Sequence, residues 1–482
     1  MNISHLNIGI VHSLVGKNDG VSIVIDQTVK AMVKYMDIDL GHIHFLAAHT
    51  SPRFNAETDD VFWHKNGIHK RVLDNYSNPV ASTLDNEIHQ YALYAKKIIT
   101  RFIESNSIDL LIAHNTSHPL NFITAVAIGY YFEELREQGI IWPKLLVWWH
   151  DSYFERERFK NPSPVIKKYL KYLPGTYVDG IAFINNTQPS LAKRLFKQYN
   201  RAKLDLFFKD RITVVPNTSE IEWDWKNVNW ESDDLVFPPQ DNYNNSFFRD
   251  INLISSINRK GFTLKDAVIL LQHTRVVPRK KIELAIDFAF MLEKRFLEDG
   301  RKKCVVVLVS GHSGDEQAGY ERFLHTYFDQ RMKAEPGSNV VLVFGEDRIL
   351  SHRDIIVDKK YYKFAEIPSI ISAYGGLGTF FSEVEGYGNN LLEMISFGLP
   401  VVINKYDVYK EEIEHLGFQL PAIENGLITD QVVEQAYELL TNMKKRKEVM
   451  LHNLNTLHEK LDHKIIAEKL SPLINKMFTR IL

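Results

Sequence analysis

Cysteine is almost absent from this sequence. Its 482 residues include one cysteine, Cys304, which excludes an intramolecular disulfide and a metal site built from several thiolates. Cys304 opens the apolar run CVVVLVS, where we expect a buried thiol in a strand. His-Glu-x-x-His is also missing, and no Asp-x-Asp pair follows a predicted strand. We therefore expect neither a metal site nor a metal cofactor.

Excess charge and long apolar runs are lacking as well. The 58 basic and 60 acidic residues give a formal net charge of −2, so no long-range field recruits nucleic acid or an anionic membrane. The apolar runs fall far short of the roughly 20 residues that span a bilayer. The N-terminus, MNISHLNIGIVHSL, has no charged segment followed by a long apolar one, as a secretory signal would. We expect a soluble cytoplasmic protein with no transmembrane segment and no nucleic-acid partner; composition leaves its oligomeric state open.

What the chain does contain is a regular alternation of short β-branched runs with longer helical patterns. Strand, helix and strand repeated in this way predict a parallel sheet that is covered on both faces. A chain of 482 residues is too long for one ordinary core, so we predict an α/β fold with two doubly wound domains. The candidate strands are 7–14, 42–48, 109–115, 144–151, 180–185 and 212–217, and then 268–273, 304–311, 340–345, 378–383 and 400–404.

The alternation breaks over 219–250, which is acidic, aromatic and rich in Asn and Pro. We interpret 219–250 as a linker between an N-terminal domain, 1–218, and a C-terminal domain, 251–464. The last segment, 465–482, carries an apolar helical stripe that we expect to pack back across the junction. Ligands of doubly wound sheets bind beyond the carboxyl ends of the strands, so we expect the two domains to face a central cleft.

The strongest local signal is 381–404, FSEVEGYGNNLLEMISFGLPVVIN. A strand ends near Ser382, a glycine-broken loop follows, and a helix begins at about Asn389. The N-terminus of that helix offers free N–H groups and a positive dipole end to an anion. Glu393, one turn into the helix, suits a ribose diol, and Glu385 in the loop can reach the hydroxyls of a sugar. The residues expected to bind a nucleotide here are Gly386, Tyr387, Gly388, Asn389, Asn390 and Glu393.

Glu385-Gly386-Tyr387-Gly388-x4-Glu393, followed by GLPVV, resembles the donor signature of retaining glycosyltransferases of the sucrose-synthase-like family, glycosyltransferase family 4, which has the GT-B fold. The segment HTRVVPRKKIELAI (273–286) is similar to the family's segment in which an Arg and a Lys five residues later hold the diphosphate. That resemblance implies these roles for Arg275 and Lys280. Lys281 stands where the family often has glycine, which leaves open whether Lys280 or Lys281 reaches the phosphates.

Polar residues also follow the strands of the first half. The resemblance implies that His150, which ends KLLVWWHD with Asp151, contacts the donor sugar, and a buried structural histidine is the alternative. His114 and Asn115 are expected to line an acceptor pocket. The loop at Asp19 and Gly20 is either a plain turn or an approach to diphosphate or acceptor through its N–H groups. His12, and His312 with Asp315 in the loop SGHSGDE, are weaker candidates.

The resemblance implies a retaining hexosyltransferase that moves glucose or mannose from a UDP- or GDP-sugar to a hydroxyl of a small-molecule or saccharide acceptor. It needs no cofactor and no protein nucleophile. The loop SGHSGDEQAGYERFL is similar to transferases of the glucosylglycerate and mannosylglucosylglycerate kind. A catalytically silent carbohydrate-binding protein is one alternative. A nicotinamide-dependent oxidoreductase is another, but HSLVGKNDG after the first strand lacks Gly-x-Gly-x-x-Gly.

Overall fold

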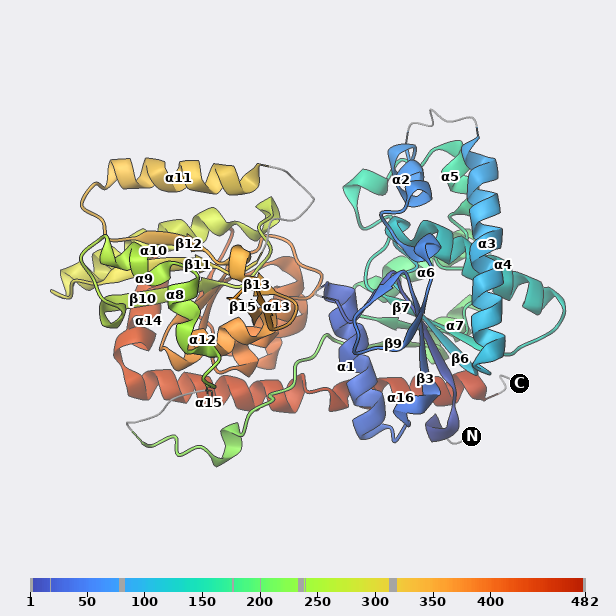
Figure 1. Cartoon of the computed structure of the whole chain (residues 1–482). Coiled ribbons are helices and arrows are strands. Elements are labelled where there is room, and N and C mark those ends of the chain that lie inside the picture. Colours follow the sequence, from blue (N-terminus) through green and yellow to red (C-terminus); the bar gives the residue numbers. More distant parts are fainter. Residues whose placement is uncertain are drawn as a thin grey trace. The chain divides into compact units, whose positions relative to one another are not determined.

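The computed structural model describes residues 3–17, 19–77, 83–175, 177–199, 201–232, 238, 240–311 and 319–479. The chain divides into two compact units, the first made of 1–218 with 463–482 and the second of 219–462. Each unit has a parallel sheet between layers of helices (Figure 1). This architecture confirms the α/β class that the alternating pattern predicts.

The first unit has a seven-stranded sheet in the order β5-β3-β1-β6-β7-β8-β9, with parallel pairing throughout. The strand order reverses between β1 and β6, which is where doubly wound sheets bind ligands. The strands are β1 (Ile8–Val11), β3 (Ile43–Ala47), β5 (Ala56–Thr58), β6 (Leu110–His114), β7 (Lys144–Trp149), β8 (Gly180–Phe183) and β9 (Ile212–Val214). A separate short parallel pair joins β2 (Leu14–Val15) to β4 (His49–Thr50).

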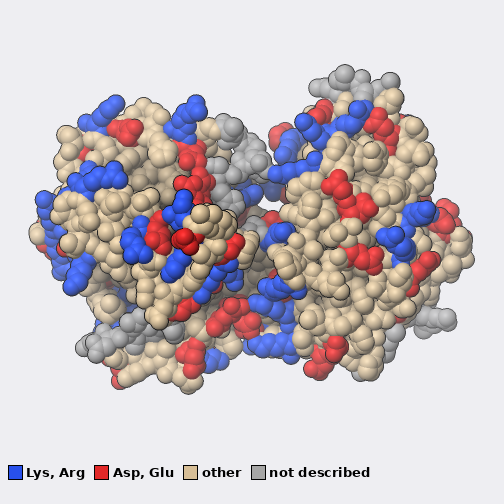
Figure 2. Space-filling view, viewed as in Figure 1, with Lys and Arg blue, Asp and Glu red and all other residues tan. Residues whose placement is uncertain are grey.

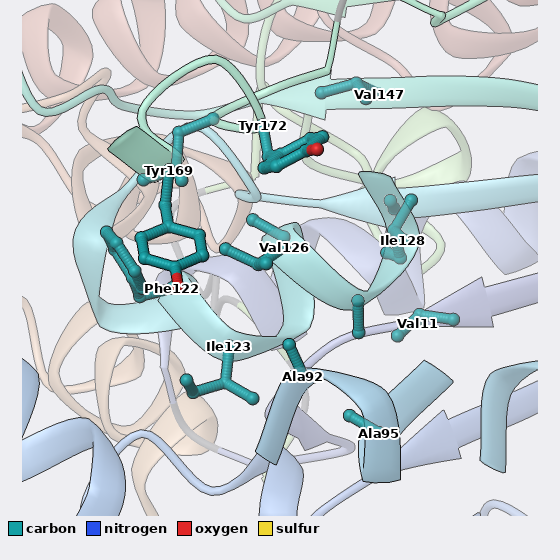
Figure 3. Packing of buried hydrophobic residues seen from close by; sticks show 14 of the residues in the cluster. Val11, Ala92, Ala95, Phe122, Ile123, Val126, Ile128, Val147, Tyr169 and Tyr172 are labelled. Atoms are coloured by element: carbon teal, nitrogen blue, oxygen red, sulfur yellow. The ribbon is translucent and has the colours of Figure 1, made fainter. Parts of the chain in front are cut away.

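Helices cover both faces of this sheet. They are α1 (Gly20–Tyr35), α2 (Gly67–Asp74), α3 (Leu84–Ser105), α4 (Phe122–Glu137), α5 (Pro164–Tyr169), α6 (Gln188–Gln198), α7 (Leu204–Asp210) and α16 (Lys464–Phe478). Figure 3 shows one layer, in which Phe122 and Val126 of α4 lie among side chains from α3 and from the sheet. On the other face, α16 packs against α1, and both contribute to a second core. The last helix is therefore a structural part of the first unit.

The second unit has a six-stranded parallel sheet in the order β12-β11-β10-β16-β17-β18, which reverses between β10 and β16. Its strands are β10 (Ala267–Gln272), β11 (Cys304–Val309), β12 (Val341–Phe344), β16 (Leu377–Phe380), β17 (Val401–Asn404) and β18 (Ala422–Ile423). A small three-stranded sheet joins β13 (Ile349–Leu350), β14 (Asp354–Ile356) and β15 (Lys359–Lys363). The helices are α8 (Phe247–Asp250), α9 (Leu253–Asn258), α10 (Ile282–Glu298), α11 (Tyr320–Ala334), α12 (Ile367–Ala373), α13 (Asn389–Ser396), α14 (Asp430–Thr441) and α15 (Met443–Lys460).

The stretch 219–250 belongs to the second unit, where its described residues are packed and partly helical. Trp223 donates its indole N–H to the carbonyl of Ser396 at the end of α13, at 2.8 Å. Trp225 is buried, and Trp230 donates to its carbonyl at 3.1 Å. The stretch thus lacks a helical or strand period because its backbone is irregular, and hydrogen bonds and burial of its tryptophans hold that backbone in place.

The remaining expectations for the fold concern the burial of Cys304, membrane-spanning helices and the distribution of surface charge. Cys304 is buried in β11, as the apolar run predicts, and burial raises the pKa of its thiol to about 12. No helix in the described part of the chain is long and apolar enough to cross a membrane. On the face shown in Figure 2, acidic and basic side chains occur over both units, in keeping with the small net charge.

Candidate active site

The loop between β16 and α13 has a turn that only glycine can form. Gly388 has φ of +122°, and a Cβ there would lie 2.3 Å from the hydroxyl oxygen of Tyr406. That hydroxyl donates to the carbonyl of Tyr387 at 2.6 Å, and both tyrosines are buried. The turn therefore fixes the start of α13 at Asn389. This start follows β16, which pairs with β10 at the point where the strand order reverses. The first N–H groups of such a helix lack intrahelical partners and favour an anion.

Glu385 in this loop is held by two cations. The Lys280 ammonium pairs with one carboxylate oxygen, and the Arg279 guanidinium lies 3.1 Å from the other. The side chains of Lys280 and Glu385 are only 7% and 9% exposed. Burial lowers the pKa of Lys280, an effect that Glu385 opposes. Burial alone would raise the pKa of Glu385, but Lys280 and Arg279 bring it below its usual value. Each group therefore favours the charged form of the other.

Arg275 and Lys281 flank this pair differently. Arg275 is exposed, its guanidinium has no hydrogen-bond or ion-pair partner within the described residues, and its charge contributes to lowering the pKa of Lys280. The ammonium of Lys281 instead points to Glu383, at 3.2 Å. Lys281 has φ of +48°, a left-handed conformation that glycine adopts at no cost. This backbone explains why a glycine suits position 281 and sets Lys281 apart from the buried pair.

Glu393 faces a histidine that sequence reasoning did not single out. One carboxylate oxygen lies 3.0 Å from Nε2 of His273, and Nδ1 of His273 lies 2.9 Å from the hydroxyl of Ser310. The imidazole is fully buried and stacks on Phe364 with ring centroids 4.0 Å apart. Asn390 donates its side-chain amide to the carbonyl of His273 at 2.6 Å. The polar ending of β10 was the available signal, since His273 directly follows this buried strand.

We expect Glu393→Ala to weaken binding of the nucleoside diphosphate by about 10- to 100-fold, because a charged acceptor of hydrogen bonds is lost. Glu393 is 23% exposed, and its second oxygen has no partner among the described residues, so it is open to a ligand. Glu393→Gln should keep part of the affinity. Glu383→Ala is the control, because this carboxylate of the same loop is 61% exposed. Calorimetry with UDP, GDP and ADP measures the effect, and wild-type affinity in Glu393→Ala would exclude the ribose role.

Three histidines lie at the carboxyl ends of the adjacent strands β1, β6 and β7. Nδ1 of His12 lies 3.3 Å from the carbonyl of His114, and Nδ1 of His114 lies 3.1 Å from Nε2 of His150. Burial lowers the pKa of all three, that of His150 to about 3. They are therefore neutral at pH 7 and serve as hydrogen-bonding groups without charge. Trp148 stacks on His114 at 5.1 Å, which fixes the middle ring of this row.

The loop before α1 also reaches this end of the sheet. Asp19 caps α1, with one oxygen accepting from the N–H groups of Val21 and Ser22 at 3.2 and 3.1 Å. Its other oxygen is buried without a partner within the described residues, as is the side-chain oxygen of Asn115, whose φ is +55°. Gly20 begins α1, and a Cβ there would meet nothing within 4 Å. His12, Asn115 and His150 thus share one unit, while His312 and Asp315 lie outside the described residues.

The described residues include no group of three or more His, Cys, Asp or Glu that could hold a metal ion. Positive charge at the β16–α13 loop comes from Lys280, Arg279 and Arg275 instead. In the first unit the row of His12, His114 and His150 is neutral. The loop of the second unit therefore offers cations to a ligand, and the histidine row of the first unit offers uncharged hydrogen-bonding groups.

Comparisons with known proteins agree with this geometry. No known family profile matches the chain. It is 28% identical to the mannosylglucosylglycerate synthase of Petrotoga mobilis over 440 residues, which cover 87% of this chain and 86% of that protein. A protein of the same name from Thermotoga maritima is 28% identical over 207 residues, 39% of this chain and 44% of that protein.

Solved structures resemble the whole chain at low sequence identity. Anabaena Alr3699/HepE in complex with UDP-glucose is 14% identical with a TM-score of 0.53, covering 97% of this chain and 100% of that one. Sucrose-phosphate synthase from Thermosynechococcus elongatus is 10% identical with a TM-score of 0.55, covering 98% and 99%. These neighbours have the GT-B fold, and so does this chain. The prediction of the fold class is confirmed.

Proposed function

We propose that this chain, a glycosyltransferase with the GT-B fold, moves a hexosyl group from a UDP- or GDP-sugar to a hydroxyl of a small glycoside with retention of configuration. The observation that carries the proposal is the buried Lys280–Glu385 pair beside the first turn of α13. The name of the Petrotoga mobilis relative adds a substrate class, because mannosylglucosylglycerate contains glucosylglycerate joined to a mannosyl group. We therefore propose glucosylglycerate as the acceptor and mannose or glucose as the sugar.

The charge distribution suits departure of a diphosphate. When the sugar–phosphate bond breaks, positive charge develops at the anomeric carbon and negative charge on the leaving diphosphate. Arg275 supplies a planar fork and Lys280 a point charge to stabilise those oxygens, and the first turn of α13 adds N–H groups. Lys280 is already fixed by Glu385, so little reorganisation is needed. In this assignment Lys281 pairs with Glu383 and does not reach the phosphates.

The acceptor hydroxyl attacks the anomeric carbon from the face that the diphosphate leaves. The new glycosidic bond forms as the sugar–phosphate bond breaks, and the hydroxyl proton passes to an oxygen of the departing diphosphate. No protein nucleophile is needed for this step. His150 and His114 are neutral, so they can form hydrogen bonds with sugar hydroxyls. A neutral imidazole does not repel the positive charge that develops at the anomeric carbon. Glu385 binds hydroxyls of the hexose, and Glu393 binds the ribose diol.

The test is a matrix of donors and acceptors. UDP-, GDP- and ADP-activated glucose and mannose, all with α configuration, are incubated with glucosylglycerate, and proton NMR identifies the anomer of the product. We expect transfer from UDP- or GDP-sugar with an α linkage. An inverted product would exclude retention. Stabilisation by a nucleotide sugar, which adds about 2.7 kcal/mol at 100 times Kd, without transfer or hydrolysis would favour a catalytically silent binding protein.

A further inference from the structure

The first unit contains a pocket that none of the predicted site residues line. Its volume is about 590 Å³, and its walls include Leu14, Lys17, His49, Thr50, Thr58 and Trp63. The floor comes from the short pair of β2 and β4, in which Leu14 lies opposite His49 and Val15 opposite Thr50. His12 and Ser13, which directly precede β2, place the pocket close to the row of histidines. The pocket therefore adjoins the part of the sheet where the acceptor is expected.

Trp63 forms a fixed aromatic wall of this pocket. The imidazole of His49 packs edge-on to its ring, with centroids 4.5 Å apart, and the ring of His64 lies 4.4 Å away. His64 is itself anchored, because its Nδ1 lies 2.9 Å from the hydroxyl of Ser13 and its N–H donates to that hydroxyl at 3.2 Å. Burial lowers the pKa of His64 to about 4, so the wall is uncharged at neutral pH. A rigid, half-buried indole is suited to the apolar face of a sugar ring.

The charge of the pocket is positive. Lys17 lines it and has no ion-pair or hydrogen-bond partner in the described part of the chain, and no Asp or Glu belongs to the described lining. The ammonium of Lys65 lies 5.9 Å from the centre of the Trp63 ring. A pocket of about 460 Å³ in the second unit differs in this respect. The lysine that lines it, Lys405, is paired with Glu414 and Glu424. An unpaired lysine beside an aromatic wall and two threonines matches a glycoside that carries a carboxylate.

We propose that this pocket is the acceptor site, that Trp63 packs against the sugar ring and that Lys17 pairs with the acceptor's carboxylate. The inference rests on the proposed transferase function and deepens it, because it names the residues that would recognise the sugar ring and the carboxylate of the acceptor. Lys17 lies two residues before Asp19, which caps α1 at the edge of the histidine row. One short segment thus joins the carboxylate-binding group to the expected reaction site.

The experiment compares an anionic acceptor with a neutral one of similar size. Wild type and Lys17→Met are assayed with glucosylglycerate and with glucosylglycerol, which lacks the carboxylate. We expect Lys17→Met to lower kcat/KM for glucosylglycerate by about 10- to 100-fold, as loss of one charge-assisted bond implies, and to change that for glucosylglycerol less than about twofold. Lys70→Met is the matched control, since Lys70 is an exposed lysine of α2 in the same unit. Affinity for the nucleotide donor should be the same in all three proteins.

Trp63 provides a second arm. Trp63→Ala should lower kcat/KM for both acceptors alike, and Trp63→Phe should restore most of the loss, because a ring face remains. Equal losses on both acceptors in Lys17→Met, or none on either, would overturn the assignment of the carboxylate to Lys17. Transfer by wild type to neither acceptor, despite donor binding, would instead count against the proposed function. The two failures are therefore distinct.

Discussion

Lys280→Met is expected to lower kcat by about 100- to 1,000-fold, the scale on which single stabilising groups act at developing negative charge. It should also destabilise the second unit. The Lys280 and Glu385 side chains are less than one-tenth exposed, and removing one partner of a buried pair leaves a charge in a poorly solvated place, at about 3–5 kcal/mol. Arg279, 3.1 Å from Glu385, remains to offset part of that cost. Both effects are measured on one variant, by steady-state transfer and by urea unfolding.

Two neighbouring cations serve as controls for Lys280. Arg275→Met should also lower kcat strongly, but with an unfolding free energy within about 0.5 kcal/mol of wild type, because Arg275 is exposed and its guanidinium has no partner among the described residues. Lys281→Met should have little effect on kcat, since Lys281 pairs with Glu383 at the surface. If Lys281→Met loses more activity than Lys280→Met, the phosphate ligand is Lys281 and the assignment made here is wrong.

Removing α16 is expected to unfold the first unit. Besides Ala467, it buries five large apolar side chains in the core that it shares with α1, and each of these contributes roughly 1.5–3 kcal/mol by burial. They are Ile466, Leu470, Leu473, Ile474 and Met477. Their sum is comparable to the whole stability of an ordinary domain, about 5–15 kcal/mol. Because α16 is part of the core of the first unit, a chain truncated before α16 should fail to give a folded first unit.

A point variant tests the same idea without deleting chain. Ile474 is fully buried, so Ile474→Ala should lower the unfolding free energy by about 2–5 kcal/mol. Gly180→Ala should disturb the packing of α16 against β8, because a Cβ at position 180 would lie 2.6 Å from the sulfur of Met477. Lys476→Ala is the control on the exposed face of α16, where the Lys476 ammonium lies 4.0 Å from Asp210 in a long ion pair. A chain that lacks α16 and still unfolds cooperatively with two intact units would contradict this prediction.

Much of the fold could be predicted because it depends on neighbours in sequence. The apolar run at Cys304 becomes the buried strand β11, and the glycine-broken loop before Asn389 becomes the turn that starts α13. Strand ends shift by at most three residues; β1, for example, spans Ile8–Val11 within the predicted 7–14. The contacts of the stretch 219–250, such as the hydrogen bond from Trp223 to Ser396, could not be predicted, because a hydrophobic period carries no information about them.

The sequence by itself determined the alternation of strands and helices, the turn at Gly388 and the kinds of charged residue near it, because backbone conformation and hydrophobic period act over a few residues. Only the tertiary structure decided which side chains meet. Glu385 meets Lys280 across 105 residues and Glu393 meets His273 across 120, because β10 and β16 are paired in the sheet. Trp63 and Lys17 likewise face one pocket through the pairing of β2 with β4. Such partners follow from topology, and topology is set by burial of the whole core rather than by any local pattern.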